Sequence, residues 1–247
     1  MICNKLLSLA MVTLTILCTN TSCEKNLDLK NMLNQPITKE SNDILLNFKD
    51  VAVENNISCI NENKIQKIIN QHNVDDNKFI IFIREDDKDD FHSGVVINKK
   101  IYDFGKISSQ IDKSNLDLDT IEEIDLFGES LIKIQGAMGL NYVLTNYYSI
   151  DNNLPKIFLV AEGHTEELDL DEDGIQEIVS SVVAGTTSFI DIYEYNDGKL
   201  TVSNLNEELN AVTVILKDGK VFEAYFEGLP NQPKQYKYSH KKLIEIK

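Results

Sequence analysis

From Lys78 onward, short runs of apolar and β-branched residues recur about every eight to twelve residues, and turn-forming residues separate them. This spacing is typical of consecutive antiparallel strands. We expect strands at 79–83, 95–97, 101–104, 121–126, 131–135, 142–150, 156–161, 178–183, 188–195, 200–202, 212–216, 221–226, 235–238 and 243–246. The sequence therefore predicts a mainly β fold, in which antiparallel hairpins build a propeller-like or sandwich sheet stack.

Two connections between predicted strands contain Asp-Gly, in the turns 196–199 and 217–220. Asp-Gly is favoured in two-residue hairpin turns, where both central residues need a positive φ. These turns support the antiparallel assignment. The β domain is expected to cover 78–247.

The pattern differs before residue 78. Apolar residues of 42–56 fall at helical spacing, as do Ile65, Ile68 and Ile69 within 61–72. This spacing predicts a small N-terminal helical segment over 42–77.

The first residues have the features of an export signal. Leu6 to Leu17 is an apolar run without a charge, too short for the roughly 20 residues of a membrane-spanning helix. A cysteine close behind it resembles the lipidated residue of bacterial lipoprotein signals, which implies a lipidation site at Cys23, or less favourably at Cys18. We expect a signal over 1–22 and a polar tether over 23–41. If Cys23 is not lipidated, a disulfide between Cys23 and Cys59 is the alternative.

The formal net charge of −16 and the pI near 4.6 restrict the possible partners. Nucleic acids and anionic membrane surfaces attract basic proteins, so the composition argues against nucleic-acid binding. An acidic surface is compatible with a cation-rich exterior.

The strongest candidate for a binding site is the acidic segment 169–177. Asp169, Asp171 and Asp173 alternate with other residues, and Gly174 follows, where a turn needs a conformation that disfavours a Cβ. Calcium takes several carboxylate and carbonyl oxygens at about 2.3 to 2.6 Å. We expect the calcium ligands to be Asp169, Asp171, Asp173, the Ile175 carbonyl and Glu177. The alternative is an acidic turn without an ion.

An EF-hand is excluded, because Ser180 stands where its bidentate Glu belongs and a strand follows in place of a helix. The pattern D-x-D-x-D-G-x-x-[DE]-[IL] before a strand resembles the calcium loop of FG-GAP and VCBS-type repeats. The run 127–131, Phe-Gly-Glu-Ser-Leu, is similar to the Phe-Gly opening of such repeats. The resemblance implies calcium and an extracellular β scaffold.

Other candidate chemistry is weaker. His164 is interpreted as a turn residue, since calcium prefers oxygen ligands, and no serine lies in a nucleophile-elbow pattern. The sequence favours a binding or scaffold role over an enzymatic one. We expect an exported, lipid-anchored calcium-binding β domain that acts as a binding or scaffold module at the cell envelope. Its expected partner is an envelope protein or polysaccharide, and its membrane contact is the lipid anchor. The alternative is a hydrolase that acts on envelope polymers and contains a structural calcium ion.

Overall fold

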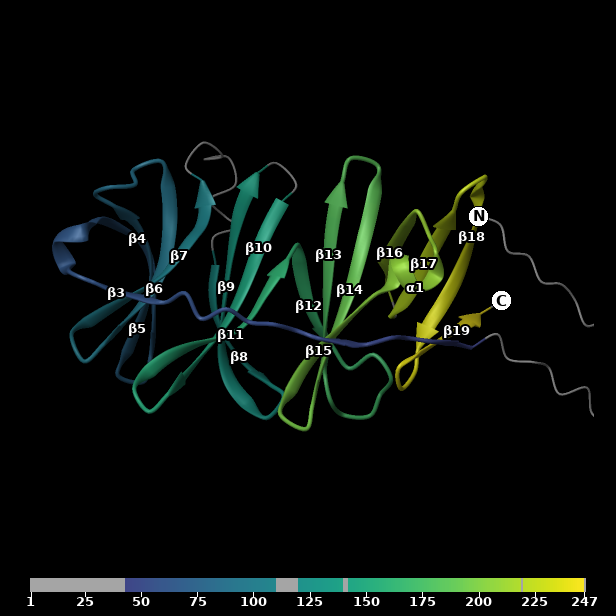
Figure 1. Cartoon of the computed structure of the whole chain (residues 1–247), viewed down its shortest axis with the longest axis horizontal. Helices are drawn as coiled ribbons and strands as arrows, with labels where there is room; N and C mark the ends of the chain where they lie inside the picture. Colours follow the sequence, from purple (N-terminus) through teal and green to yellow (C-terminus); the bar gives the residue numbers. More distant parts are fainter. Residues whose placement is uncertain (1–42, 110–119, 140–141, 219, 247) are drawn as a thin grey trace, which may run out of the picture. The chain divides into compact units, whose positions relative to one another are not determined.

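The computed structural model describes residues 43–109, 120–139, 142–218 and 220–246. Most of these residues lie in strands, and the strands pair antiparallel (Figure 1). Helical structure in this part of the chain consists of α1 (Leu205–Leu209) and a 3-10 turn (Glu62–Lys64). None of its helices is long and apolar enough to cross a membrane. The predicted mainly β fold is confirmed.

The strands form four sheets, which we number I to IV. Sheet I contains β3 (Ser58–Ile60), β4 (Ile65–Val74), β5 (Asn77–Arg84), β6 (Asp90–Ile97) and β7 (Lys100–Ser109). Sheet II contains β8 (Thr120–Leu126), β9 (Glu129–Gly139), β10 (Tyr142–Asp151) and β11 (Leu154–Glu162). Sheet III contains β2 (Lys49–Asp50), β12 (His164–Leu168), β13 (Glu177–Ala184), β14 (Thr187–Asn196) and β15 (Lys199–Asn204). Sheet IV contains β1 (Ile44–Leu45), β16 (Thr213–Lys217), β17 (Val221–Phe226), β18 (Leu229–Tyr238) and β19 (Lys242–Ile246).

Successive sheets pack through three clusters of buried apolar side chains. These clusters include Phe79 and Ile134 between sheets I and II, Tyr147 and Ile178 between II and III, and Ile190 and Phe222 between III and IV. Burial of apolar surface on facing sheets is the main force that holds such a stack together. The packing is sandwich-like, which agrees with one of the two predicted arrangements.

The helical prediction for 42–77 is wrong. The segment 43–60 runs across the sheets (Figure 1): β1 pairs with β19, β2 pairs with β15, and β3 pairs with β7. The rest of the segment forms β4, which pairs with β5. Two β-bulges in β4, between Ile65 and Lys67 and between Ile68 and Asn70, break the two-residue alternation. Ile65 packs with Ile80 and Ile101, whereas Ile69 packs with the cluster that faces sheet II, so the two residues lie on opposite faces of sheet I.

Every strand predicted from 79 onward is present, and several are longer than expected. The turn at Asp197 and Gly198 has positive φ at both residues, 53° and 78°, as predicted. After residue 79, two elements were not predicted: β12, in a stretch that looked like a turn, and the short α1. The predicted signal 1–22, the tether 23–41 and Cys23 lie outside the described residues. Cys59 is exposed and forms no disulfide within the described residues.

Candidate metal site

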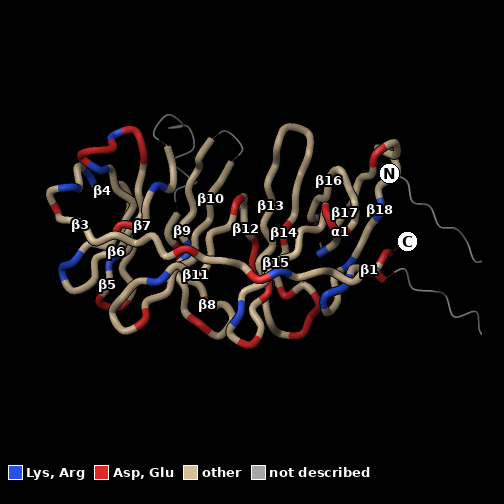
Figure 2. Tube along the Cα trace, viewed as in Figure 1, with Lys and Arg blue, Asp and Glu red and all other residues tan. Residues whose placement is uncertain are grey.

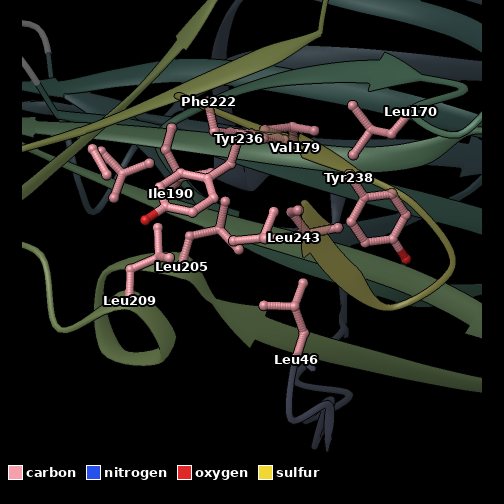
Figure 3. Close-up of a cluster of buried hydrophobic side chains, with 13 residues drawn as sticks. Leu46, Leu170, Val179, Ile190, Leu205, Leu209, Phe222, Tyr236, Tyr238 and Leu243 are labelled. Carbon is pink, nitrogen blue, oxygen red and sulfur yellow. The ribbon is translucent and has the colours of Figure 1, made fainter. Parts of the chain in front are cut away.

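The predicted calcium loop connects β12 to β13, at the junction of sheets III and IV. Leu170, within the loop, is 5% exposed and belongs to the apolar cluster between these sheets (Figure 3). Burial of a leucine stabilises by roughly 1.5 to 3 kcal/mol, so Leu170 fixes the acidic residues on either side of it against the core.

The loop is also folded by its own carboxylates. Asp169 accepts the backbone N–H groups of Asp173 and Gly174, at 3.0 and 3.1 Å, and Asp173 accepts the N–H of Ile175 at 2.8 Å. Gly174 has a φ of 90°, a conformation that favours glycine and explains its place in the pattern. Asp169 thus shapes the loop, and it is not among the residues that line the adjacent pocket.

Asp171 is the most deeply placed of the three aspartates, with its side chain 4% exposed. Its Oδ2 accepts the backbone N–H of His240 at 2.9 Å and lies 2.7 Å from Nδ1 of the same residue. Its Oδ1 is buried and has no hydrogen-bond partner within the described residues. A buried acceptor without a partner costs about 1 to 3 kcal/mol, and more when it is charged.

Glu177 is the first residue of β13 and is 6% exposed. It accepts the backbone N–H of Leu170 at 2.9 Å. Burial raises the pKa of Glu177 to about 7; the Leu170 N–H opposes this shift, and the nearby charges of Asp171, Asp173 and Glu194 add to it. The site therefore concentrates negative charge that nearby groups do not fully neutralise.

These acids line a pocket of about 240 Å³ formed where several turns meet. The β12–β13 loop contributes Asp171, Asp173 and Ile175, and β13 contributes Glu177. The other lining residues are Phe127 after β8, Glu194, Tyr195 and Asn196 of β14, Tyr238 of β18, and His240 and Lys241 of the β18–β19 turn. Side-chain ligand atoms of Asp171, Asp173 and His240 lie within 4.8 Å of one another.

Glu194 differs from the other acids of the pocket, because it has its own partners. It accepts hydrogen bonds from the Tyr238 hydroxyl and, at 2.9 Å, from Asn196, and it lies 3.3 Å from the ammonium of Lys241. Burial, followed by the nearby Glu194, raises the pKa of Tyr238. Lys241 also lies over the Phe48 ring, which places this cation between β14 and the segment 43–60.

Four of the five predicted metal ligands line one pocket, but among the predicted side-chain ligands only Asp171 and Asp173 belong to the group, completed by His240, whose ligand atoms lie within 4.8 Å of one another. The four are Asp171, Asp173, Ile175 and Glu177, while Asp169 holds the loop backbone. His164, at the start of β12, is exposed and does not line the pocket. The sequence did not indicate Glu194, Tyr238 or His240, because strand pairing and sheet packing bring them to the loop from distant positions.

A second buried acid, Asp103 of β7, lies in sheet I and is 2% exposed. It accepts hydrogen bonds from Arg84 Nη1 at 2.9 Å and from the Gly105 N–H at 2.8 Å, and its Oδ1 lies 3.4 Å from His92 Nδ1. Burial by itself raises the pKa of Asp103, but His92, the Gly105 N–H and Arg84 lower it below its ordinary value. This acid is neutralised within its own sheet.

Comparisons of the chain with protein-family models, with curated proteins and with solved structures found no match.

Proposed function

We propose that the pocket beside 169–177 binds one calcium ion and that the protein is a calcium-stabilised β module of the cell envelope. The observation that carries this proposal is the buried Asp171 Oδ1, a charged acceptor without a hydrogen-bond partner, in a pocket lined by further carboxylates. A cation supplies the missing partner. Without one, burial of these acids together is unfavourable.

The donor set suits a hard cation. Asp171, Asp173 and Glu177 offer carboxylate oxygens, and Ile175 offers its carbonyl, all of them oxygen ligands of the kind that calcium prefers. Asp169 would act through the loop backbone, because its two oxygens accept the N–H groups of Asp173 and Gly174. His240 is a poor ligand for calcium. Its Nδ1 instead contacts the carboxylate of Asp171.

A bound ion would have a structural consequence. The loop belongs to sheet III, and His240 belongs to the β18–β19 turn of sheet IV. Lys220, in the turn before β17, also donates a hydrogen bond to the Asp169 carbonyl. By neutralising Asp171 and Glu177, calcium would strengthen the junction between these sheets, which suits a scaffold.

The proposed location depends on the N-terminal segment and on the loop. The resemblance of 1–23 to a lipoprotein signal supports export and a lipid anchor at Cys23, and the resemblance of 168–179 to FG-GAP and VCBS-type loops supports an extracellular calcium module. Such modules bind calcium with dissociation constants of about 10⁻⁴ to 10⁻³ M. An envelope protein or polysaccharide is the proposed partner.

Thermal unfolding with calcium or with a chelator tests the metal site. Calcium at roughly a hundredfold above its dissociation constant stabilises by about 2.7 kcal/mol, which raises the Tm of a domain of this size by roughly 5 to 10 °C. We expect this rise in the wild type and its loss in Asp171→Asn. Asp75→Asn is the matched control, because Asp75 is an exposed aspartate of the β4–β5 turn in sheet I. An equal calcium response in both variants would contradict the proposal.

A second candidate function is hydrolysis of an envelope polymer, and one observation favours it. Glu177, with a pKa near 7, shares its pocket with Asp171, Asp173 and His240, and an acid with a raised pKa close to other carboxylates is suited to general acid catalysis. Release of reducing ends from envelope polysaccharide by the wild type, and its absence in Glu177→Gln, would identify this activity.

A further inference from the structure

The face of sheet I that points away from sheet II carries a groove of about 750 Å³. Along β5, Phe79 and Ile81 face sheet II, so Lys78 and Ile80 point to the other face. The floor of the groove includes the buried Ile80 and Ile101 and the half-buried Val96. Ile65 and the exposed Ile68 of β4 complete an aliphatic lining. A volume of this size lies within the range of about 300 to 1,000 Å³ typical of small-molecule sites.

Four lysines are among the lining residues; strand register places Lys78 on the groove face, whereas Lys67 and Lys100 lie opposite Ile83 and Ile97, which face sheet II. Lys67 comes from β4, Lys78 from β5, and Lys99 and Lys100 from the β6–β7 turn and the start of β7. Within the described part of the chain none of the four forms an ion pair, although eight other lysines do. Glu62 is the one acid among the described lining residues. In a chain with a net charge of −16, such a basic rim is unexpected. Figure 2 shows the lysine segments of sheet I in blue.

Strand register places the charge beside the apolar floor. Lys78 lies opposite Val96, Val96 lies opposite Ile101, and Ile101 lies opposite Ile60. One cross-strand row therefore passes from a cation to three aliphatic side chains. A ligand in the groove meets positive charge at one end and branched aliphatic side chains along the remainder.

We propose that this groove binds an aliphatic carboxylate, namely a single-chain fatty acid. The alkyl chain would cover the isoleucine and valine floor, and the carboxylate would pair with Lys78 of the rim. Charge complementarity supports an anion, and the described lining residues include no aromatic ring on which a sugar or a nucleobase could stack. The groove belongs to sheet I, whereas the proposed calcium pocket lies at the junction of sheets III and IV.

Isothermal titration of the full-length protein with decanoate tests this proposal. We expect saturable binding with one site per groove, weakened by salt because the contact is ionic. The variant Lys78→Gln should bind decanoate at least about tenfold more weakly, since the charge-assisted contact on the groove face is lost. Lys237→Gln is the matched control, because it removes the same charge from an exposed position of sheet IV.

Two further measurements keep the test decisive. Ile68→Asp puts a negative charge into the groove at a side chain that is already 40% exposed, so it should weaken decanoate binding without unfolding sheet I. Decanol has the same chain without the charge and should bind more weakly than decanoate. Absence of saturable binding would overturn the proposal. It would also be overturned by equal binding of decanol, by equal loss in the control variant, or by binding of an acidic peptide while decanoate does not bind.

Discussion

Asp103 in sheet I and Glu177 in sheet III are both buried carboxylates, but their pKa values shift in opposite directions. Burial alone raises the pKa of each, because the charged form loses its water. Arg84, His92 and the Gly105 N–H compensate Asp103 and lower its pKa. Glu177 has one N–H partner and three acidic neighbours, and its pKa rises to about 7.

The difference shows which buried acid is neutralised by cations of the protein itself. Around Asp103, the fold supplies its own cations from β5 and β6. In the pocket that Glu177 lines, the ammonium of Lys241 pairs with Glu194. A buried group of acids without matching cations is stable only when protons or an external cation neutralise it. The comparison therefore favours a metal at the III–IV junction and none at Asp103.

Asp103→Asn should cause the largest loss of stability. Removal of this charge leaves His92 buried and Arg84 partly buried without their shared partner, a change that typically costs about 3 to 5 kcal/mol. Urea unfolding should show the same loss with calcium and with chelator. Asp86→Asn, at an exposed carboxylate that also pairs with Arg84, should have a much smaller effect than Asp103→Asn. If the loss of stability in Asp103→Asn differs between calcium and chelator, the conclusion that Arg84, His92 and the Gly105 N–H neutralise Asp103 is contradicted.

Glu177→Gln should increase the stability of the protein when calcium is removed, whereas Asp103→Asn decreases it. The pKa of Glu177 lies above the ordinary value of about 4.3 and reaches about 7, so the folded state binds the proton more tightly than the unfolded state. Wild-type stability without calcium should therefore fall as the pH rises from about 4.3 to about 7. Above that window Glu177→Gln should be more stable by roughly 2 to 3 kcal/mol in chelator. A variant that is less stable than the wild type in chelator would refute this account.

His92 should give a smaller, separate pH dependence. Burial lowers the pKa of His92, but its contacts with Asp103 and Asp87 outweigh this and raise it. The protonated form is thus favoured in the folded state, and its contribution is fully present below about 6.5. Stability should decline as the pH rises above that value, and His92→Gln should remove this decline. Unfolding midpoints measured across this range, with calcium present throughout, test the prediction.

The sequence could indicate that Asp171, Asp173 and Glu177 line one pocket, because they are close together in the chain and Gly174 allows the turn between them. That they bind calcium stays a prediction. Glu194 and His240 could not be predicted, since they reach the pocket only when β14 and the β18–β19 turn pack beside the loop. No local sequence pattern indicates that packing.

The strands were predictable from alternation and turn residues, but the segment 42–77 was not. The two bulges in β4 interrupt the two-residue alternation that identifies a strand. The strands β1, β2 and β3 are short and are stabilised by pairing with distant edges. The lysine groove was not recognised for a similar reason: Lys67, Lys78 and Lys100 come from three strands and form no motif.

Equilibrium dialysis of the purified protein against radioactive calcium tests the central claim most directly. The account predicts one ion bound per chain, with a dissociation constant between about 10⁻⁴ and 10⁻³ M, and no binding in Asp171→Asn. Absence of bound calcium at millimolar concentration, or undiminished binding by Asp171→Asn, would contradict it.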